Sequence, residues 1–270
     1  MAIPLILPNL WFPPPESLYV TAMSVIGLSS LASAGYSEIK GKHMQYSKFL
    51  NVGVGVANKQ KEIKLSSRNG MLLLYAPAFL VGLASFFLFP DQDFRFTLLG
   101  SALTVHFLKR VLEVLFLHKY SGSMALDSAI TITMSYTLST ATMIYAQYLS
   151  RDFTEPSFDL KYVGVGLFTM GIIGNFYHHC ILASLRKEGD KEYKIPQGGL
   201  FDLVICPHYL FEIFGYVGIS CISQTPYAYA FTLGTILYLT GRSYATRRWY
   251  ISKFGDKFPK EVKAFIPYVF

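Results

Sequence analysis

Apolar residues gather in seven stretches along the chain, and short polar segments separate them. Each stretch is close to the roughly 20 residues that a helix needs to cross a bilayer. Their positions are 17–36, 70–90, 95–117, 126–150, 161–185, 200–222 and 225–245. The pattern predicts an all-α integral membrane protein, a bundle of about seven transmembrane helices that forms a single domain over residues 1–270.

Basic residues alternate between the connections of this bundle. All lysines and arginines except Arg95, Arg151 and Lys161 lie at the ends of the first, third, fifth and seventh stretches or directly after them. Short loops rich in these residues stay on the cytosolic side of a membrane. We therefore expect the N-terminus on the lumenal side and the C-terminus in the cytosol.

The composition agrees with a membrane protein. Hydrophobic residues make up 52% of the chain and charged residues 15%, against about 25% charged in soluble domains. The net charge of +7 follows from the cytosolic loops, so we expect no nucleic-acid partner. It also suits an anionic cytosolic ligand such as a dinucleotide or coenzyme A. The three cysteines form no CxxC pair, so neither a disulfide framework nor a zinc site is expected.

The third stretch carries four ionisable residues on one helical face, namely His106, Lys109, Arg110 and Glu113. A charge that faces lipid at mid-membrane costs about 2.5–3.5 kcal/mol on insertion scales. This face must therefore meet protein, water or the cytosolic interface. Two interpretations stay open: a functional pocket, or an internal salt-bridge network in which Glu113 pairs with Lys109 or Arg110.

The fifth stretch places Asn175, His179, Leu182 and Arg186 on one face. Polar groups in a membrane helix usually face a protein-lined cavity, and the basic segment that follows could hold a charged ligand. We therefore expect a cofactor here. The adjacent His178 and His179 point about 100° apart on a helix, so they cannot chelate one metal alone, and no metal site is predicted.

The last two stretches also carry polar groups. In the sixth, His208, Glu212 and Tyr216 share a face. An unpaired buried carboxylate is costly, so we expect Glu212 to accept hydrogen bonds from a ligand or to pair with Arg242. In the seventh, three polar residues lie on or near one face: Arg242, Thr246 and Tyr250.

Several tracts resemble a known family. Those similar to the steroid 5α-reductases are Tyr193-Lys-Ile-Pro-Gln-Gly-Gly-Leu-Phe201, Gly41-Lys42-His43 and Lys263-Ala-Phe-Ile-Pro-Tyr-Val-Phe270. Those more similar to the trans-2-enoyl-CoA reductases are the tract from His106 to Lys119 and Cys206-Pro-His-Tyr-Leu-Phe-Glu212. The chain resembles this joint family of membrane enzymes from about Gly41 to Phe270, most densely over 171–270.

The resemblance implies a seven-helix bundle in the endoplasmic reticulum membrane, with NADPH bound from the cytosolic side. It also implies hydride transfer to the β-carbon of a C=C bond conjugated to a carbonyl. Implied cofactor positions are Lys42, Asn175, His179, Arg186, Tyr193, Lys194, Glu212, Arg242 and Tyr250, with Lys42 and Lys194 as phosphate partners. Such a set makes physical sense because the phosphates need countercharge and the nicotinamide needs fixed hydrogen bonds.

The chain also departs from the steroid reductases. Their second-span glutamate and third-span tyrosine contact the steroid ketone, and the residues here are Tyr75 and Phe107. At two further cofactor positions, His208 replaces an asparagine and Thr246 a histidine. The electrophile pair of the steroid enzymes is therefore not carried over.

Three residues are candidates for the polar catalytic group, namely Tyr75, Lys109 and Tyr209. Tyr75 could donate from its phenol or be an ordinary packed aromatic residue, whereas the enoyl-reductase resemblance favours Lys109 and Tyr209. Each donor would stabilise the enolate that forms as hydride arrives, before a proton reaches the α-carbon. We assign four residues to the substrate pocket: His106, Phe107, Arg110 and Glu113.

We therefore predict an NADPH-dependent oxidoreductase for a lipophilic substrate within the bilayer, first a 3-oxo-Δ4 steroid and alternatively a very-long-chain trans-2-enoyl-CoA. A more distant alternative is a membrane methyltransferase of the isoprenylcysteine type. The acidic pair usual near its C-terminus is not evident, because Arg247-Arg248-Trp249-Tyr250 stands there. A transporter would favour paired repeats and broken helices, and the sequence has no internal repeat.

Overall fold

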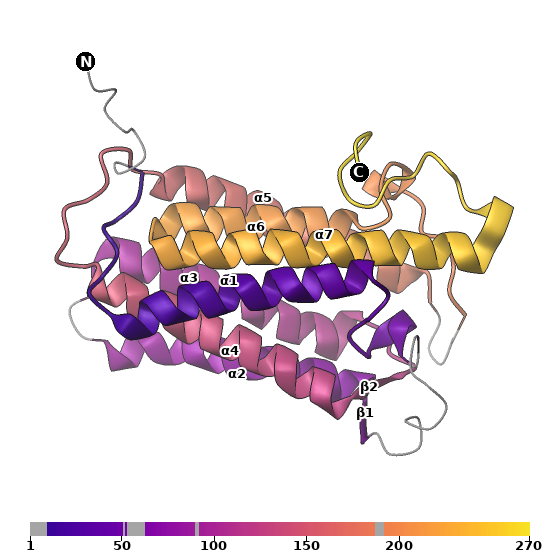
Figure 1. The fold of residues 1–270 in the computed structure, drawn as a ribbon, viewed down its shortest axis with the longest axis horizontal. Helices are drawn as coiled ribbons and strands as arrows, with labels where there is room; N and C mark the ends of the chain where they lie inside the picture. Colours follow the sequence, from indigo (N-terminus) through magenta and orange to yellow (C-terminus); the bar gives the residue numbers. More distant parts are fainter. Residues whose placement is uncertain (1–9, 51, 53–62, 90–91, 187–191) are drawn as a thin grey trace.

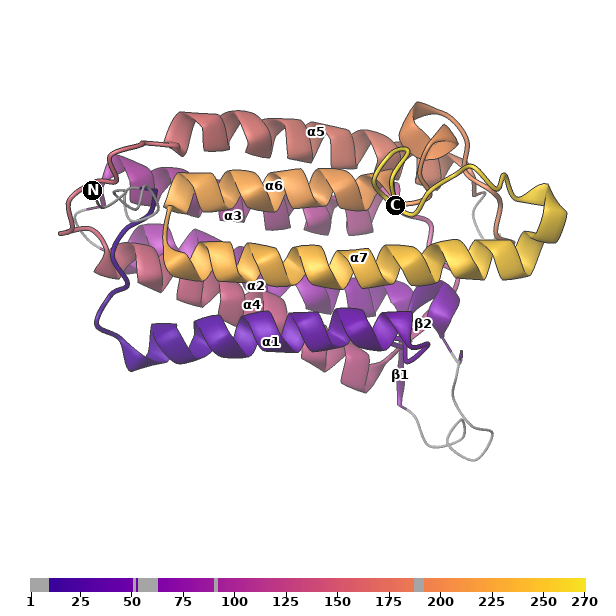
Figure 2. The same cartoon turned by 45° about the horizontal axis from the view of Figure 1, so that its top comes forward.

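The computed structural model describes residues 10–50, 52, 63–89, 92–186 and 192–270. In that part of the chain, seven α-helices run side by side along the long axis (Figure 1, Figure 2). They are α1 (Leu18–Ile39), α2 (Ser67–Leu88), α3 (Phe94–Leu112), α4 (Leu126–Leu149), α5 (Lys161–Ser184), α6 (Pro207–Ser223) and α7 (Pro226–Phe254). Each helix coincides with one apolar stretch of the sequence, so the helix order is as predicted.

Local signals set where the helices begin. Ser66 and Asp93 accept hydrogen bonds from the backbone N–H three residues later, at 3.2 and 2.6 Å, at the starts of α2 and α3. These side chains satisfy amides that have no partner within the first turn. Helices α6 and α7 begin at Pro207 and Pro226, where proline is favoured because a missing N–H leaves no bond unmade.

Two helix boundaries differ from the prediction. We expected the sixth helix from residue 200, but α6 begins at Pro207. The expected first residues form a 3-10 turn, η5 (Gly199–Asp202). The backbone N–H groups of Ile205 and Cys206 then donate to carbonyls of the C-terminal tail at 2.9 and 3.0 Å, so the α-helix starts only at Pro207. At the other end, α7 extends beyond residue 245 to Phe254.

A small two-stranded sheet accompanies the helices of this mostly helical protein. Strand β1 (Lys64–Ser66) pairs with β2 (Ser123–Ala125) in antiparallel register, with Leu65 opposite Met124. A single-turn π-helix, η4 (Glu113–Leu117), continues α3, and β2 follows it shortly afterwards. The sheet therefore ties the starts of α2 and α4 together at one end of the bundle (Figure 1).

Two helix pairs approach closely through glycine. A Cβ on Gly241 of α7 would collide with the backbone of Gly35 on α1. A Cβ on Gly171 of α5 would likewise collide with the backbone of Gly215 on α6. Small residues let membrane helices approach until their backbones touch. These contacts hold α1 against α7 and α5 against α6.

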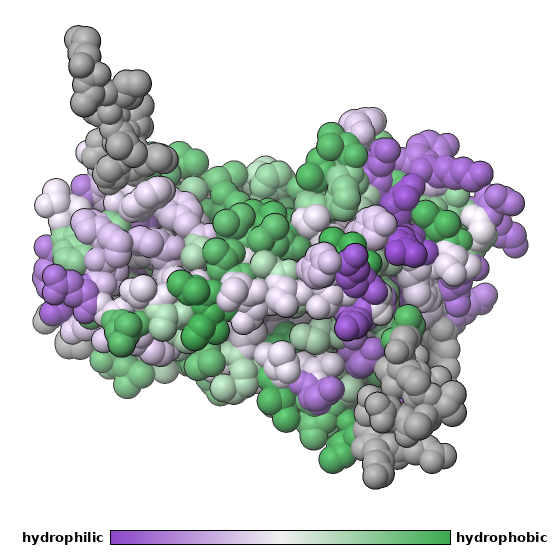
Figure 3. Space-filling model, viewed as in Figure 1, coloured by the Kyte–Doolittle hydropathy of each residue, from purple (hydrophilic) through white to green (hydrophobic). Residues whose placement is uncertain are grey.

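The membrane character of the bundle is visible in its helices and its surface. Three helices of the described chain, α1, α2 and α5, are long and apolar enough to cross a membrane. Helix α6 is only 17 residues long. Figure 3 shows hydrophobic side chains along the bundle and many hydrophilic ones at the end where α7 finishes. The count of seven spans and the orientation of the termini stay predictions.

A buried arginine ties the opposite end of the bundle together. The guanidinium of Arg95 on α3 donates to the carbonyl of Ile222 at 2.7 Å, to Gln224 at 3.1 Å and to Asp159 at 2.8 Å. Gln224 follows α6 in a left-handed conformation with φ of 49°. These bonds join α3, the end of α6 and the connection before α5, so this end is closed by polar contacts.

Candidate functional site

A cationic cavity of about 310 Å³ opens at the end of the bundle where α3, α5 and α7 finish. Its lining comes from six helices and from the connections after α1, α3 and α5. The positively charged lining residues are Lys48, Arg110, Lys119, Arg186, Lys194 and Arg242. Cations gathered in a partly enclosed space attract anions, so this cavity is suited to an anionic ligand.

A second cavity, of about 320 Å³, lies deeper between α1, α2, α4, α6 and α7. Its lining is mainly apolar and includes Met23, Leu31, Leu74, Ile132 and Phe231. Three further lining residues are exposed on the outside of the protein: Ile26 of α1 and Met134 and Leu138 of α4. The apolar cavity therefore reaches the lateral surface of the bundle between α1 and α4.

The two cavities meet at a shared wall, which we call the junction. It is formed by Tyr46, Met71, Tyr75, Tyr136, Glu212, Tyr238 and Leu239, since all of these line both cavities. A ligand in the cationic cavity and a ligand in the apolar cavity would touch each other at this place. Four of its residues are tyrosines, which offer hydroxyl groups in otherwise apolar surroundings.

Tyr75 of α2 is held at the junction by Arg110 of α3. The Nη2 of Arg110 donates to the phenolic oxygen of Tyr75 at 2.6 Å, and the guanidinium carbon lies 4.6 Å from the centroid of the tyrosine ring. An arginine only donates, so the phenol keeps its own proton for another acceptor. The positive charge beside the oxygen strengthens the phenol as a hydrogen-bond donor.

The carboxylate of Glu113 forms ion pairs with both cations of α3. Lys109 and Arg110 each approach its carboxylate to 2.9 Å, and Nδ1 of His179 on α5 donates to it at 2.9 Å. Lys109 also donates to the side chain of Asn175. Of the two interpretations of this polar face, the structure has the internal salt-bridge network, with Glu113 paired to both cations.

Two ionisable side chains that line the cationic cavity, Lys48 and His118, have lowered pKa values. Burial lowers the pKa of Lys48 to about 8, and Arg242 and Arg186 act in the same direction, against the opposing effect of Cys206. Burial and the nearby Arg110 lower the pKa of His118 to about 4. At neutral pH His118 is therefore uncharged, whereas Lys48 is largely protonated but close to its titration range.

The described residues between α5 and α6, 185–186 and 192–206, contribute to the wall of the cationic cavity. Nδ1 of His178 donates to the carbonyl of Gly174 at 2.7 Å, which leaves Nε2 to accept the N–H of Leu200 at 3.1 Å. The guanidinium of Arg186 lies 4.7 Å from the ring centroid of Tyr193. One histidine thus fixes the glycine-containing turn to α5, while an arginine and an aromatic ring line the entrance.

The sequence matches a family model described as 3-oxo-5-alpha-steroid 4-dehydrogenase over residues 123–270, more than half of the chain. The chain belongs to this family. The matched region covers α4 to the C-terminal tail. It therefore includes the α5–α6 segment and the parts of α6 and α7 that line the cationic cavity.

Individual relatives are named either as enoyl-CoA reductases or as steroid-converting enzymes. The very-long-chain enoyl-CoA reductase of Dictyostelium discoideum is 33% identical over 168 residues, which cover 62% of this chain and 55% of the relative. The steroid 5-alpha-reductase of Gossypium hirsutum is 41% identical over 107 residues, covering 40% and 42%. The human 3-oxo-5-alpha-steroid 4-dehydrogenase 1 is 38% identical over 117 residues, covering 43% and 44%. The chain spans about half the length of these relatives.

Most of the cofactor positions expected in this reductase family line one cavity. Those on the wall of the cationic cavity are His179, Arg186, Tyr193, Lys194, His208, Glu212, Arg242 and Tyr250. Asn175 lies one layer behind it, where its amide donates to the carbonyl of His208 at 2.8 Å. Lys42 lies on a separate surface hollow beside Gly41 and His43, and Thr246 is buried in α7 away from the cavity wall.

The predicted catalytic and substrate residues separate into two groups. Tyr75 lines both cavities, Tyr209 and Arg110 line the cationic cavity, and Lys109 lines neither. The remaining three are packed behind the walls: His106, Phe107 and Glu113. His106 lies 3.5 Å from the hydroxyl of Tyr216 through its Nε2. Among the three candidate donors, only Tyr75 faces the junction.

Of the two alternatives for Glu212, the pairing with Arg242 is not the one in the structure. Arg242 donates instead to Glu38 of α1 at 2.6 Å, and His43 approaches the other oxygen of that carboxylate at 2.6 Å. This partner comes from a helix that sequence spacing does not relate to α7. Within the described chain, Glu212 has no hydrogen bond or ion pair to a side chain, and it faces the junction.

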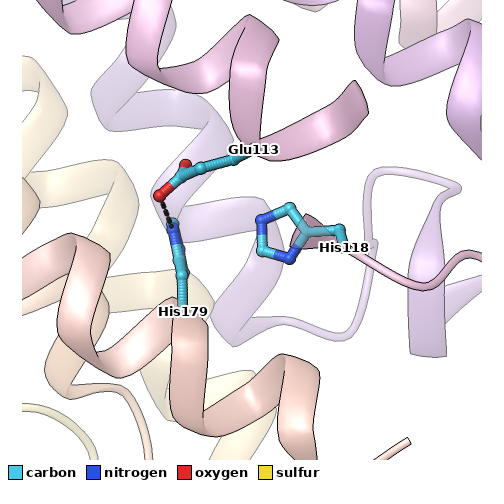
Figure 4. Close-up of side chains that lie close together, drawn as sticks. All are labelled: Glu113, His118 and His179. Atoms are coloured by element: carbon cyan, nitrogen blue, oxygen red, sulfur yellow. Dashed lines mark hydrogen bonds and ion pairs between the residues drawn. The ribbon is translucent and has the colours of Figure 1, made fainter. Parts of the chain in front are cut away.

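Three side chains come close enough together to hold a metal ion. Glu113, His118 and His179 each bring one ligand atom within 4.8 Å of the others (Figure 4). Figure 4 shows His118 facing the bonded pair of Glu113 and His179. The carboxylate already carries Lys109 and Arg110 at 2.9 Å, and a metal cation would have to displace that positive charge. The cluster therefore fits a metal poorly, and the absence of a metal site stays a prediction.

Several site residues were missed by sequence reasoning. Lys48 and Tyr46 lie in the connection after α1, which has no helical period to predict their neighbours. Glu38 lies just after the first apolar stretch and resembles an ordinary interfacial charge. Tyr136 lies among threonines and serines of α4 without an ionisable neighbour. No sequence signal marked these residues, because their partners belong to distant elements.

Proposed function

We propose that this chain reduces a C=C bond conjugated to a carbonyl in a lipophilic substrate, using NADPH. The observation that carries the proposal is the junction, where a cationic cavity and an apolar cavity share the Tyr75 phenol and Arg110 donates to its oxygen at 2.6 Å. An anionic cofactor in the cationic cavity and a lipophilic substrate in the apolar cavity would be in contact at this wall.

The cationic cavity is the cofactor site in this proposal. Lys48, Arg186 and Lys194 neutralise the phosphates, and the additional phosphate of NADPH adds to the need for such groups. The Glu212 carboxyl accepts hydrogen bonds from the carboxamide of the nicotinamide at the junction. When bound, NADPH supplies a hydride to the β-carbon of the substrate.

Tyr75 is the group that binds the carbonyl oxygen. As the β-carbon gains hydride, the C=C electron pair moves to the α-carbon and the oxygen, and negative charge develops on the oxygen. The Tyr75 phenol donates a hydrogen bond to it, and Arg110 stabilises the phenol from behind. A proton then adds at the α-carbon to give the saturated carbonyl compound. Lys109 does not take this role because Glu113 and Asn175 occupy its ammonium group.

A 3-oxo-Δ4 steroid is the first substrate of the proposal. The apolar cavity has a volume of about 320 Å³, in the range of small-molecule pockets. A compact polycyclic skeleton would occupy it with its ketone at Tyr75. The opening between α1 and α4 lets a molecule dissolved in the bilayer enter without crossing water. Family membership and the named steroid reductases support this choice.

A very-long-chain trans-2-enoyl-CoA is the second candidate. The relative with that printed name aligns over the larger share of this chain, 62%. The same lateral opening would let a long acyl tail continue into the lipid, and the thioester carbonyl would take the place of the ketone. With either substrate, only the carbonyl group and the C=C bond conjugated to it need to lie at the junction.

The remaining features of the proposal concern location. We place the seven helices in the endoplasmic reticulum membrane, with the cationic cavity on the cytosolic side, where NADPH is available. The basic loops at that end of the bundle support this orientation. The N-terminus is then lumenal.

Purified protein in lipid nanodiscs tests the proposal when it is given NADPH with a 4-en-3-one steroid or a long-chain trans-2-enoyl-CoA. We expect NADPH oxidation and a saturated product with at least one of the two. Binding of S-adenosylmethionine, measured by a shift in melting temperature, would instead favour the methyltransferase alternative. No oxidation with either substrate, in protein that unfolds cooperatively, would overturn the proposed function.

A further inference from the structure

The four phenols of the junction differ in how their hydroxyl groups are used. The hydroxyls of Tyr46 and Tyr238 lie 3.4 Å apart, and that of Tyr75 accepts from Arg110. Within the described part of the chain, the Tyr136 hydroxyl has no hydrogen-bond partner. The residue Tyr136 lines both cavities, so it lies where the two ligands would meet.

The ring of Tyr136 is held in place by its neighbours. Its centroid lies 5.7 Å from that of Tyr75 with an angle of 30° between the ring planes. On another side Phe107 of α3 packs against it at 5.5 Å in an edge-on arrangement. Phe107 contributes no polar atom. The hydroxyl of Tyr136 is therefore a second polar group beside Tyr75 on a ring whose position is fixed.

A ligand that fills the junction would remove the half-buried Tyr136 phenol from water. A hydroxyl that loses water without a new hydrogen bond costs about 1–3 kcal/mol. Ligand pockets contain few such polar groups, and those that are present orient the ligand. A carbonyl oxygen can accept two hydrogen bonds. Tyr75 faces the junction and can donate one of them to a substrate carbonyl there, so a second donor can be used.

We propose that the Tyr136 hydroxyl donates a second hydrogen bond to the carbonyl oxygen of the substrate, so that two phenols from α2 and α4 hold the developing enolate. This inference rests on the proposed function and adds a catalytic residue to it. Tyr75 receives charge support from Arg110, whereas Tyr136 contributes a neutral donor from the opposite helix. Substrates without an oxygen at this place would gain nothing from Tyr136.

Tyr136→Phe removes the hydroxyl and keeps the ring. Tyr145→Phe is the matched control, because Tyr145 is also on α4 and lines neither cavity. With the enone that the wild type reduces, we expect Tyr136→Phe to lower kcat about 100-fold, as loss of one oxyanion donor does. The Kd for NADPH and the melting temperature should stay within error, and Tyr145→Phe should stay within twofold of wild type.

A second measurement does not depend on turnover. An ionised naphthol presents a planar ring with an oxygen anion, as the enolate does, and its Kd can be measured with NADP⁺ present. We expect Tyr136→Phe to weaken this binding at least tenfold, as loss of a hydrogen bond to a charged group does, and Tyr145→Phe to leave it unchanged. Equal kcat and equal naphthol affinity in Tyr136→Phe and wild type would overturn the inference.

The two measurements separate this inference from the proposed function. If the wild type reduces an enone and Tyr136→Phe does so at the same rate, the proposed function stands and the inference fails. If the wild type oxidises no NADPH, the proposed function fails. Naphthol binding that is insensitive to Tyr136→Phe then also rejects Tyr136 as a ligand contact.

Discussion

The Nη2 of Arg110 on α3 lies 2.6 Å from the phenolic oxygen of Tyr75 on α2. This bond places a permanent positive charge behind a neutral donor at the point where the two cavities meet. The steroid-reductase pattern, to which the sequence is similar, has a glutamate at the position of Tyr75. A phenol supported by arginine is a physically reasonable replacement, because it presents a proton to a carbonyl without a buried negative charge.

Tyr75→Phe should lower kcat about 100-fold with an unchanged Kd for NADPH, because it removes a donor that acts on the developing enolate. Tyr209→Phe is the matched comparison, since Tyr209 lines the cationic cavity alone. We expect it to stay within a few-fold of wild type. Steady-state kinetics with the accepted enone measure both effects. A larger loss in Tyr209→Phe than in Tyr75→Phe would transfer the donor role to Tyr209.

Affinity for NADPH should fall as pH rises through 8. The pKa of Lys48 is lowered to about 8 in the ligand-free protein, so the side chain is protonated below that value and loses its charge above it. Binding of phosphate requires the charged form, and Kd should therefore rise about tenfold between pH 7 and pH 9. Titration by fluorescence of the bound nicotinamide follows this change.

Two variants of Lys48 test whether this side chain causes the change in NADPH affinity near pH 8. Lys48→Arg keeps the charge at all accessible pH values, so its Kd should stay nearly constant up to pH 9. Lys48→Gln should bind weakly throughout and show no step near pH 8. The same step in Lys48→Gln as in wild type would mean that another group titrates.

Close packing of α1 on α7 depends on glycine. Gly241→Ala would force a methyl group against the backbone of Gly35, and we expect a loss of about 1–3 kcal/mol in the free energy of unfolding, as in overpacked cores. Gly27→Ala on α1 is the control, because its methyl group would meet nothing within 4 Å. Unfolding in denaturant measures both. Equal stability of the two variants would show that the helices can separate at no cost.

The buried pair of Glu38 and Arg242 predicts a strong effect on stability. Glu38→Gln leaves the Arg242 guanidinium without its countercharge, and removing one partner of a buried pair typically costs about 3–5 kcal/mol. Lys42→Ala, at an exposed position nearby, should change stability by no more than about 0.5 kcal/mol. Thermal unfolding in nanodiscs compares the two variants. An unchanged melting temperature for Glu38→Gln would contradict the buried pairing.

Sequence periodicity predicted the helices and the faces of several site residues. It placed Asn175 and His179 on one side of α5, whereas Arg186, expected on the same face, lies beyond the end of that helix at Ser184. It could not predict which helix faces which, so Glu212 was considered as a partner of Arg242, whereas the partner in the structure is Glu38. Residues outside the α-helices, such as Lys48 in a single 3-10 turn, have no sustained periodicity from which a neighbour can be predicted.

The same limit applies to chemical roles. Lys109 and Tyr75 both looked like donors in the sequence, and a helical wheel does not distinguish them. The distinction comes from the packing: Lys109 is bound to Glu113 and Asn175 and lines neither cavity, whereas Tyr75 lines both. Competition among neighbours for a polar group is a property of tertiary structure.

Transfer of deuterium from NADPH labelled at the reactive C4 hydrogen tests the central claim most directly. Wild-type protein is incubated with the labelled cofactor and a 4-en-3-one or enoyl thioester, and the product is examined by mass spectrometry and NMR. We predict a saturated carbonyl compound with one deuterium on the β-carbon. Deuterium on the carbonyl carbon of an alcohol, or cofactor oxidation with no deuterium in the product, would contradict the account.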